Sequence, residues 1–597
     1  MRVCDLVAKF VYDSGVRDVF MVSGGGVMYL IDGLACNDKL NKVCNHHEQA
    51  SAMAAVAYAK YTGFGCCYVT TGCGGTNALT GVLNAWQDNT ACLFISGQCK
   101  RKETLKYIGL PIRQVGVQEA DIVSIVQSIT KYAVMVDNPS DILYHLEKAV
   151  FLAKTGRPGP VWIDIPMDVQ SANVDVSQLI HFDPDKEYNE SYVITSDELD
   201  GLILDFQNAK RPVIIAGQGV RLSKSIDEFE SLIDKHNIPF VCSRLGTDVL
   251  PTTHPLNIGR IGNKGMRSAN FAVQNSDFIL VLGSRLSVSS TGQEYKYFAR
   301  MAKVVVVDID KYEHKKQTVH IEKVINADVK DVLEKLKLPS SLNYGDWAKI
   351  CQAWKESYPV CLPEYYDDSQ GINMYAFIEE LSKCLRDDSV VIGDAGSAVY
   401  VPPQALKTSF KTQRYITSGG QAEMGFSLPA AIGVSVARNN REVLAITGDG
   451  SLQMNIQELQ TLVHYGLNVK LFVWNNDGYL SIRATQNKFF NGRFLGTDSR
   501  SGVSFPNLEK IALAYGLKYV RLSSVKTLEE DIKRIMMETV PVLCEVICIP
   551  NQLIIPTVSS KELDDGQLVS CPIEDMAPFL DREELKNNMI VPIIDYE

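Results

Sequence analysis

The sequence lacks any run of about 18 or more apolar residues, the length that a membrane-spanning helix needs. Its first residues, MRVCDLVAKFVYDSGV, predict an amphipathic helix and contain no signal-peptide pattern. A basic excess is also missing, because 59 Lys and Arg face 70 Asp and Glu, for a net charge of −11. Since a nucleic-acid surface needs a basic face, we expect no nucleic acid and no membrane among the partners.

Paired metal-binding cysteines are absent as well. The chain has 15 Cys, and none falls in a CxxC pair, which argues against a structural zinc site. Several lie in apolar runs, such as Cys66, Cys67 and Cys92. We interpret these as buried thiols of a protein in the reducing cytoplasm.

What the sequence does contain is a repeated alternation of strand-like and helix-like segments. Short runs rich in Val and Ile, such as GPVWIDIP, DFILVLGS and AKVVVVDID, alternate with helix-length amphipathic segments. Such alternation predicts an α/β fold of parallel, doubly wound sheets covered by helices on both faces. A chain of 597 residues is too long for one core. We expect three such domains over 1–172, 190–340 and 365–555, and a C-terminal tail over 556–597 that packs along a surface.

Two strand ends in the third domain carry oxygen ligands. The run EVLAIT ends in the turn GDGS with Asp449, and the next run, VKLFVW, ends in two asparagines with Asn476 second. Carboxyl ends of adjacent parallel strands lie side by side, so Asp449, Asn476 and the carbonyl of Gly478 could share a Mg²⁺ ion. The N–H groups of Gly450 and Ser451 would then face a diphosphate. Each half alone is also typical of an ordinary helix cap or turn, whereas the pair at this spacing favours a metal site.

These motifs resemble those of a known family. GDGSLQMNIQEL followed by LFVWNNDGY closely resembles the metal–diphosphate motif of thiamine-diphosphate enzymes, and the group it looks like is the acetolactate (acetohydroxyacid) synthase-like one. The segments HHEQASAMAAVAYAKYTG, VTTGCGGTNALTGVLNAWQDN and TSGGQAEMGFSLPAAIG are similar to the family's other cofactor loops. The resemblance covers nearly the whole chain. It implies a pyrimidine-binding, a central and a diphosphate-binding domain, with thiamine diphosphate and Mg²⁺ as cofactors.

The resemblance assigns roles in the first domain. Glu48 matches the buried carboxyl group that hydrogen-bonds the aminopyrimidine ring and promotes proton loss from the thiazolium carbon. A helix-start Glu that only stabilises the dipole is the structural alternative. His46 and His47 precede it, and we expect a structural hydrogen bond rather than a proton relay. Gly25 and Gly72 match glycines that close over the cofactor.

In the third domain the resemblance assigns the cofactor cradle. Gly396 and Ser397 match a second phosphate turn, in which glycine lets the backbone approach the diphosphate. The backbone of Ala422 and Met424 would hold the pyrimidine, and the Met424 side chain would prop the cofactor into a bent shape. Glu423 departs from the family pattern, and both the substrate and the solvent are open as what it faces.

The reaction is predicted from which family features are present and which are missing. Simple 2-oxo acid decarboxylases tend to carry a His pair where this chain has YIGLPIRQVGVQEADIV, and a Glu where it has Ile482. Gln118, in contrast, matches a synthase Gln that faces the reacting carbon. We therefore expect a carboligase that decarboxylates a 2-oxo acid, with pyruvate as the expected donor, and joins the remainder to a second carbonyl compound. A non-ligating decarboxylase or C–C bond hydrolase is the alternative, and a non-catalytic cofactor-binding protein is a third.

The sequence says less about the identity of the second substrate, the carbonyl acceptor, than about the donor. Val117 and Thr485 stand where synthases have a Phe and a pocket-shaping Trp, which favours a larger or more polar acceptor such as a sugar-like ketone or aldehyde. Arg483 has two interpretations, an anion-binding residue or a surface Arg.

The assembly and a further cofactor also follow from the resemblance. In the family, the Glu corresponding to Glu48 reaches cofactor held by the other subunit's third domain. The resemblance therefore implies at least a homodimer with active sites at the interface. The strands VLGSRLS and VVVDIDKYE are compatible with a flavin such as FAD in the central domain, although relatives with the same strands bind none.

Overall fold

Three parallel six-stranded sheets form the framework of the chain in this computed structural model, which describes residues 1–562 and 568–594. The first sheet has the order β2 (Asn41–Cys44), β1 (Asp18–Met21), β3 (Gly65–Val69), β4 (Cys92–Gln98), β6 (Pro160–Pro166), β5 (Tyr132–Met135). The central sheet has the order β12 (Lys323–Ile325), β11 (Lys303–Val307), β10 (Phe278–Leu282), β7 (Pro212–Ala216), β8 (Phe240–Cys242), β9 (Asn257–Arg260). The third has the order β14 (Arg414–Thr417), β13 (Val390–Gly393), β15 (Val443–Gly448), β16 (Val469–Asn475), β18 (Val542–Ile547), β17 (Lys518–Leu522). The α/β fold class predicted from the sequence is therefore confirmed.

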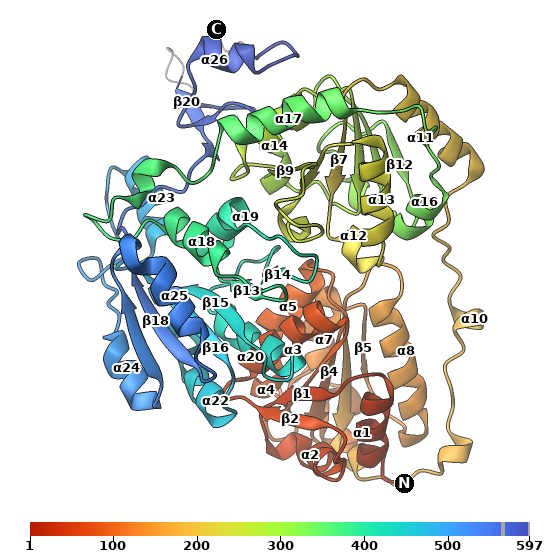
Figure 1. Cartoon of the computed structure of the whole chain (residues 1–597). Coiled ribbons are helices and arrows are strands. Elements are labelled where there is room, and N and C mark those ends of the chain that lie inside the picture. Colours follow the sequence, from red (N-terminus) through yellow and green to blue (C-terminus); the bar gives the residue numbers. More distant parts are fainter. Residues whose placement is uncertain (563–567, 595–597) are drawn as a thin grey trace.

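Helices cover these sheets, and Figure 1 shows the three units as red-orange, yellow-green and cyan-blue regions. Those of the first unit are α1 (Val3–Asp13), α2 (Met28–Ala35), α3 (Glu48–Thr62), α4 (Cys73–Asn77), α5 (Leu79–Gln87), α6 (Leu105–Ile108), α7 (Ile122–Val126), α8 (Ile142–Lys154) and α9 (Met167–Gln170). The extended segment with α10 (Pro184–Glu187) leads to α11 (Ser196–Asn208), α12 (Gly219–Leu222), α13 (Ile226–His236), α14 (Arg267–Gln274), α15 (Val288–Thr291), α16 (Val329–Lys335) and α17 (Gly345–Ser357). The third unit has α18 (Met374–Lys383), α19 (Ser397–Ala405), α20 (Ser427–Ala437), α21 (Asp449–Leu452), α22 (Leu459–His464), α23 (Leu480–Phe490), α24 (Leu508–Tyr515) and α25 (Leu528–Met536).

The strand orders distinguish the central unit from the other two. The first and third sheets share one topology, since β2-β1-β3-β4-β6-β5 and β14-β13-β15-β16-β18-β17 follow the same pattern. The central sheet instead has the 3-2-1-4-5-6 order of dinucleotide-binding folds, in which ligands bind where the strand order reverses, here between β7 and β10. Each sheet comes from one continuous stretch of chain, and we propose 1–172, 190–340 and 365–555 as the units built on them. Helix α17 falls between these ranges and packs on α14.

Helices α3 and α20 join the first and third units through a shared core. Strand residues alternate between faces, so Cys67 joins a cluster with α3 while Cys66 joins the core on the opposite face. The first cluster continues across α20 into the third sheet, so one core includes both sheets. Small residues allow this close approach: a Cβ on Gly433 of α20 would lie 2.1 Å from the Ala54 carbonyl oxygen of α3.

The C-terminal tail packs against the central unit. It contains β19 (Thr557–Val558), β20 (Ser560–Glu562), β21 (Leu568–Ser570), β22 (Met576–Ala577) and α26 (Arg582–Asn587), with β19 paired to β22 and β20 to β21. Ile573 and Leu585 join the central unit's core. The buried Asn270 amide donates to the Ile573 carbonyl at 2.7 Å, and the Gln274 amide donates to the Glu574 carboxylate at 2.6 Å.

Gly433→Ala tests the α3–α20 seam. Alanine has the better helix propensity, but its Cβ would meet the Ala54 carbonyl, so we expect the free energy of unfolding to fall by about 1–3 kcal/mol in urea denaturation. Gly201→Ala is the matched control, because Gly201 lies in helix α11 with only the end of the Lys323 side chain nearby. It should stabilise by about 0.5–1 kcal/mol. Equal effects at both positions would contradict tight packing at the seam.

Candidate active site

The predicted metal residues converge at the carboxyl ends of two neighbouring strands. Strands β15 and β16 pair in parallel with Gly448 opposite Trp474, and Asp449 and Asn476 follow those ends. Asp449 accepts hydrogen bonds from the Gly450 N–H at 2.7 Å and the Gly478 N–H at 3.0 Å. The Asn476 amide donates to the Gly478 carbonyl at 2.8 Å. Asp449 and Asn476 are 3% and 5% exposed, so both side chains are buried at this turn.

The chemistry of this turn fits a hard divalent cation. Burial raises the pKa of Asp449 to about 6, and no side chain of the described residues forms an ion pair with its carboxylate. Carboxylate, amide and carbonyl oxygens are the donors that Mg²⁺ prefers, with the remaining positions left to phosphate and water. The described residues thus provide a partial oxygen shell around a buried negative charge.

Arg483 fixes the metal turn from behind. It lies in α23 and is 6% exposed, and its guanidinium donates to the carbonyl of Asn476 at 2.8 Å and also to those of Asp477 and Pro550. The interpretation as a surface Arg is therefore wrong, whereas anion binding stays a prediction. The residue holds the backbone that presents Asn476 and Gly478.

A second predicted phosphate turn lies at the start of α19. Gly396 has φ +61°, a left-handed conformation that favours glycine, and Ser397 begins the helix. Gly450 and Ser451 belong to the first turn of α21, beside the metal residues. The four predicted phosphate-binding residues thus lie at two helix starts that follow β13 and β15, which are adjacent strands.

Asp394 connects the phosphate turn to the predicted pyrimidine loop, a role that the sequence analysis missed. Its buried carboxylate accepts from the N–H groups of Gly425 (3.0 Å) and Ser427 (3.1 Å) and from the Thr447 hydroxyl (2.8 Å). In the sequence, the only indication of this role was the position of Asp394, in GDAGS, directly after a strand. Burial raises its pKa, while the donors oppose that shift.

The loop with Ala422 and Met424 is held by acids at both ends. Ala422 has φ +52°. Asp88 of the first unit accepts from the N–H groups of Gly419 at 2.8 Å and Gly420 at 2.7 Å. Asp88 also forms a buried ion pair with Lys60 at 2.6 Å, which ties this loop to helix α3.

Glu423 is partly buried and is hydrogen-bonded by two side chains. Its carboxylate accepts from the Asn84 amide at 2.6 Å and from the Ser418 hydroxyl. Burial raises its pKa, and these two donors counteract the rise. These partners belong to the first and third units of the same chain, and a substrate-facing role for Glu423 stays a prediction.

Glu48 lies at the first position of α3 and is 9% exposed. Its carboxylate accepts from the Asn77 amide at 3.0 Å. The preceding His46 and His47 N–H groups donate to Glu458 of the third unit at 3.0 and 3.1 Å. The His47 ring accepts from the Gln49 N–H at 3.1 Å and so caps the helix.

Gly72 and Gln118 lie in contact. Gly72 has φ +63°, and a Cβ there would lie 2.1 Å from the Gln118 carbonyl oxygen. Gln118 is exposed, with φ +60°, and lies in a loop. Gly25 begins a short 3₁₀ helix, Gly25–Val27, and open space surrounds the position of its missing side chain.

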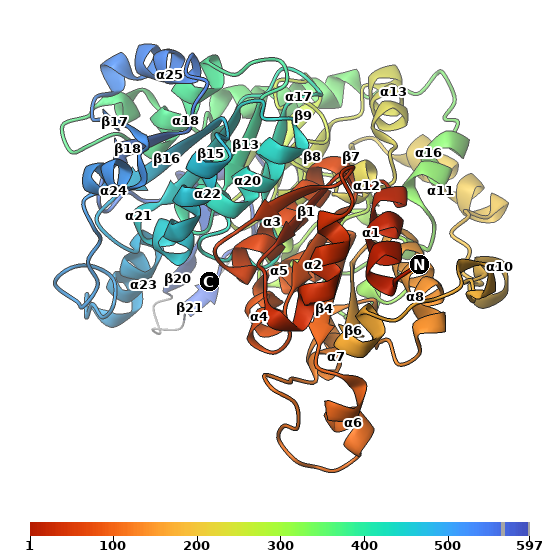
Figure 2. The same cartoon turned by 90° about the horizontal axis from the view of Figure 1, so that it is seen from below.

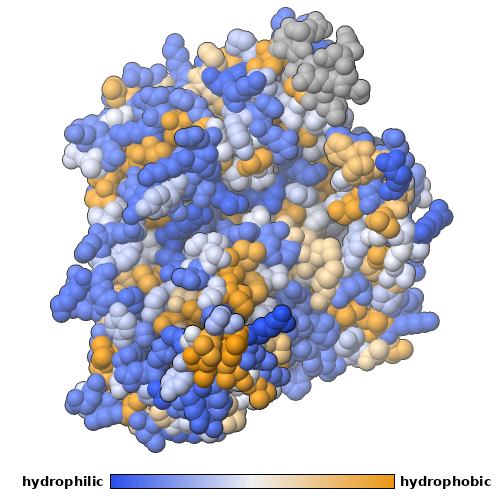
Figure 3. Space-filling model, turned by 180° about the vertical axis from the view of Figure 1, so that it is seen from behind, coloured by the Kyte–Doolittle hydropathy of each residue, from blue (hydrophilic) through white to orange (hydrophobic). Residues whose placement is uncertain are grey.

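The loop that carries Gln118 projects from the molecule. Figure 2 shows the segment around α6 standing away from the body, and Glu119 closes it by accepting from the Val115 N–H at 2.8 Å and the Gly116 N–H at 3.2 Å. Its exposed apolar side chains are Tyr107, Ile108, Leu110, Ile112, Val115 and Val117. Figure 3 shows a face on which hydrophobic residues form patches among charged ones.

The predicted residues thus form two groups. The third unit brings Asp449, Asn476 and Gly478 together, while Glu48, Gly72 and Gln118 belong to the first unit. Within the described part of one chain, no hydrogen bond or ion pair joins Glu48 to Asp449 or Asn476.

A separate cavity of about 390 Å³ lies where the central sheet reverses its strand order. Gly219, Gly283, Ser284 and Asp308 line it from the ends of β7, β10 and β11, and Arg157 lines it from the first unit. Such a crevice is the usual dinucleotide position in this topology.

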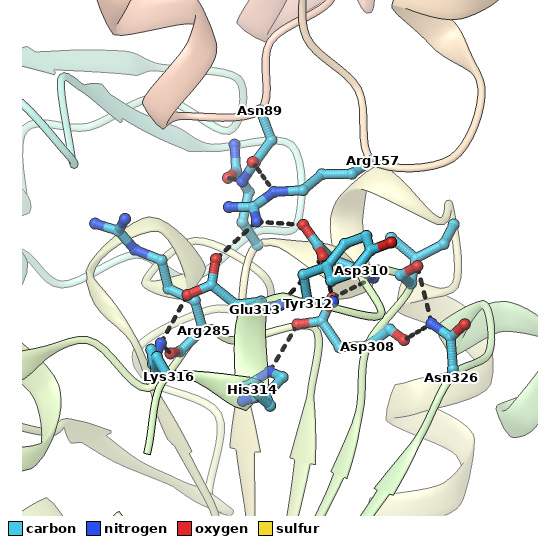
Figure 4. Close-up of polar contacts among 12 residues, drawn as sticks. Asn89, Arg157, Arg285, Asp308, Asp310, Tyr312, Glu313, His314, Lys316 and Asn326 are labelled. Atoms are coloured by element: carbon cyan, nitrogen blue, oxygen red, sulfur yellow. Dashed lines mark hydrogen bonds and ion pairs between the residues drawn. The ribbon is translucent and has the colours of Figure 1, made fainter. Parts of the chain in front are cut away.

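Arg157 connects the first unit to the edge of this cavity. Figure 4 shows it between Asn89 and two acids of the central unit. It donates to Asn89 at 2.6 Å, to Asp310 at 2.9 Å and to Glu313 at 2.7 Å. Burial raises the pKa of the Asp310 and Glu313 carboxyl groups, but the hydrogen bonds from Arg157 lower it, and the net shift of both pKa values is downward.

Comparisons with known proteins agree with this geometry. The chain matches the families described as thiamine pyrophosphate enzyme, N-terminal TPP binding domain over 1–125, central domain over 201–336, and C-terminal TPP binding domain over 394–546. It is 34% identical to the acetolactate synthase large subunit of Lactococcus lactis subsp. lactis (strain IL1403), over 93% of both chains. It is 32% identical to the acetolactate synthase isozyme 3 large subunit of Escherichia coli (strain K12), covering 88% of this chain and 91% of that one. Identity to the chloroplastic acetolactate synthase 2 of Nicotiana tabacum is 31%, over 93% and 83%.

The described helices differ in length and hydrophobicity from a membrane-spanning helix. Among them, none combines the length and apolar character that crossing a bilayer requires.

A buried acid supports the Gly72 loop from behind. Asp164 is 1% exposed and accepts from the Ser96 hydroxyl at 2.5 Å and the Gln98 amide at 3.0 Å. The side-chain oxygen Oε1 of Gln98 accepts from the Thr71 hydroxyl at 2.7 Å, next to Gly72. Burial raises the pKa of Asp164 to about 7.

This raised pKa predicts a pH dependence of stability. The folded state binds more protons than the unfolded state between the ordinary Asp pKa and about 7, so stability falls as pH rises through that window. Each unit of pKa difference corresponds to about 1.4 kcal/mol. Unfolding free energies measured by urea between pH 5 and pH 8 should decline more steeply in the wild type than in Asp164→Asn. Identical slopes would remove Asp164 as the source.

Proposed function

The chain belongs to the thiamine pyrophosphate enzymes, in the group of acetolactate synthase-like proteins, and from that premise we propose that it is a carboligase. It decarboxylates a 2-oxo acid, most simply pyruvate, and joins the remaining acyl unit to a second carbonyl compound. The observation that carries this proposal is the buried Asp449, Asn476 and Gly478 turn at adjacent strand ends, in a chain that matches synthases over nearly its whole length.

We propose thiamine diphosphate and Mg²⁺ as the cofactors. Bound thiamine diphosphate supplies a nucleophilic carbon and an electron sink for the departing carboxylate. Asp449, Asn476 and the Gly478 carbonyl would hold Mg²⁺, and Arg483 supports their geometry from the buried side. The N–H groups at Gly396, Ser397, Gly450 and Ser451 would face the diphosphate, as oriented N–H groups at helix starts favour anions.

Glu48 is the proposed proton-handling group. The Asn77 amide occupies one carboxylate oxygen and leaves the other for a ring nitrogen of the cofactor. Glu458 and the His47 cap hold the helix start, so the carboxylate is positioned before the cofactor arrives. Ala422 and Met424 would support the pyrimidine and the bend between the rings, while Gln118 would place its amide near the reacting oxygen.

A second copy of the chain would complete the site. Glu48 and Asp449 share no contact within one described chain, and Gln118 lies on a projecting loop whose exposed apolar side chains need a partner. A homodimer in which this loop and Glu48 face the partner's metal turn satisfies both observations. The thiols of Cys66, Cys67 and Cys92, buried and with a raised pKa, suit the proposed cytoplasmic location.

FAD is the second cofactor that the geometry favours, although the 2-oxo acid chemistry does not require it. The cavity of about 390 Å³ lies at the strand-order reversal of the central sheet and opens toward Gly419 and Gly420 of the pyrimidine loop. The visible absorption spectrum of the purified protein distinguishes a flavin-loaded from a flavin-free protein.

Glu48→Gln tests the catalytic assignment. Glutamine keeps the hydrogen bond from Asn77 but cannot exchange the proton, so carbon dioxide release from pyruvate should fall by about 10²–10⁴-fold while thiamine diphosphate still binds. Glu380→Gln is the control, a buried carboxylate in α18 outside the site. Near-normal turnover in Glu48→Gln would refute the role.

Mixed dimers test the shared site. Neither Glu48→Gln nor Asp449→Ala should be active alone, because each lacks one half of every site. Coexpressed, they form dimers in which an intact Glu48 of one copy faces an intact Asp449 of the other. Restored activity supports the interface site, and no restoration with both proteins folded and dimeric contradicts it. Product analysis with and without an added aldehyde separates ligation from simple decarboxylation.

A further inference from the structure

Three basic side chains of the central unit converge on Tyr400 of α19. Arg244 follows β8, Arg260 ends β9, and Lys264 lies in the loop after β9. The Arg244 guanidinium carbon and the Lys264 ammonium lie 5.3 and 5.1 Å from the centre of the Tyr400 ring. Arg260 lies 3.5 Å from the Tyr400 carbonyl oxygen. We refer to Arg244, Arg260 and Lys264 as the cationic triad.

The triad has no counter-charge in the described part of the chain. None of its members forms an ion pair with a carboxylate there, although Arg260 is only 2% exposed. Arg244 donates to the Gly419 carbonyl at 2.9 Å, and its Nε is buried without a partner. Burying a charge without an opposite charge is costly, so proteins that do so commonly place a ligand there.

Other cations at the same junctions are paired. Arg157 meets Asp310 and Glu313, and Lys60 meets Asp88 at 2.6 Å. Arg414 contacts Asp248 at 2.6 Å. The lack of ion pairs at the triad within the described residues is therefore local and not a general property of the contacts between units.

The triad lies at the ligand-binding edge of the central sheet, and Arg244 lines the cavity of about 390 Å³. The residues of the triad come from the carboxyl ends of β8 and β9, which are neighbouring parallel strands and so form the ligand-binding edge of the sheet. Tyr400 lies one helical turn after Ser397, the proposed phosphate-binding residue. Gly419, which Arg244 contacts, lies just before the loop with Ala422 and Met424.

We propose that the cationic triad binds a phosphate group of the second substrate, so that the acceptor is a phosphorylated carbonyl compound. This inference rests on the proposed carboligase function and specifies its acceptor. Three positive charges match a phosphate better than a single carboxylate, and guanidinium groups bind phosphate oxygens in a fork geometry. The cofactor's own diphosphate would have Mg²⁺, held at Asp449, as its counter-charge.

The electrostatics of Lys264 agree with an anion arriving there. Burial and the nearby Arg260 lower its pKa to about 8, so the ammonium is weakened in the unliganded protein. A bound phosphate would favour the charged form and restore its ordinary pKa.

Lys264→Met is the central test, because methionine keeps the apolar stem and removes the charge. The acceptors are glyceraldehyde 3-phosphate and its unphosphorylated counterpart, glyceraldehyde, each with pyruvate as donor. We expect the wild type to prefer the phosphorylated acceptor and Lys264→Met to raise its KM about 10–100-fold. The KM for glyceraldehyde and the rate of carbon dioxide release from pyruvate alone should not change. Lys349→Met, at an exposed position of α17, is the charge-matched control.

A binding measurement separates the triad from the catalytic reaction. Glycerol 3-phosphate has no carbonyl group, so its binding by isothermal titration reports recognition alone. Lys264→Met should weaken this binding and leave thiamine diphosphate binding unchanged. A loss of thiamine diphosphate binding instead would show that the triad serves the cofactor, which overturns the proposal.

Arg260→Met gives an independent readout of stability. If Arg260 is kept for a ligand, removing its unpaired charge should raise the Tm of the unliganded protein by roughly 1–3 °C. Glycerol 3-phosphate should then no longer raise the Tm. A lower Tm in the unliganded variant would indicate a purely structural Arg260 and contradict the proposal.

The outcomes distinguish failure of this inference from failure of the proposed function. No carbon dioxide release from pyruvate by the loaded wild type would overturn the proposed function. Ligation with equal use of glyceraldehyde and its 3-phosphate, or only with a second 2-oxo acid, would leave that function intact and overturn the role of the triad.

Discussion

The buried carboxylate of Asp449 is the constraint on which the candidate site depends. It lies at the end of β15, receives two backbone N–H groups and has no cationic partner among the described residues. A position of this kind is unfavourable for a folded chain alone and becomes favourable when a divalent cation is bound. The surrounding structure acts to maintain it: Arg483 holds the Asn476 turn by its carbonyls, and the parallel pairing of β15 with β16 sets the distance between the two strand ends.

The same turn is connected to the first unit by a second set of contacts. Glu458, just beyond the metal turn, receives the N–H groups of His46 and His47, which directly precede Glu48. Asp88 and Glu423 fix the pyrimidine loop from opposite sides, and helices α3 and α20 pack through small residues at one continuous core. Contacts within one chain thus hold both groups of predicted site residues before any partner binds. This suits catalysis by positioning, because little ordering remains to be done when substrate arrives.

Much of this could be predicted from the sequence because it is local. The alternation of apolar runs and amphipathic segments predicted the fold class, and the two strand-end motifs predicted that Asp449 and Gly478 lie together through the geometry of parallel strands. The contacts of Arg483, Glu423 and Asp394 could not be predicted, since their partners lie on other elements and, for Glu423, in another unit. When an Arg, Glu or Asp stands alone in the sequence, nothing in the sequence indicates which carbonyl or amide group it will contact in the fold. The cationic triad was missed for the same reason, as its members become neighbours only when the central unit meets α19.

Buried or partly buried charges of both signs lack ion-pair partners among the described residues, and this has an energetic consequence. Asp449 is negative without a cation, and Arg260, Arg244 and Lys264 are positive without an acid, whereas Arg157 and Lys60 nearby are paired. Pairing Asp449 directly with one of the three would have stabilised the empty chain and removed both binding sites. The fold instead keeps them on separate elements, the ends of β15 and of β8 and β9. If a cation and an anion bind as proposed, their binding would stabilise the folded chain and couple its stability to the occupancy of both places.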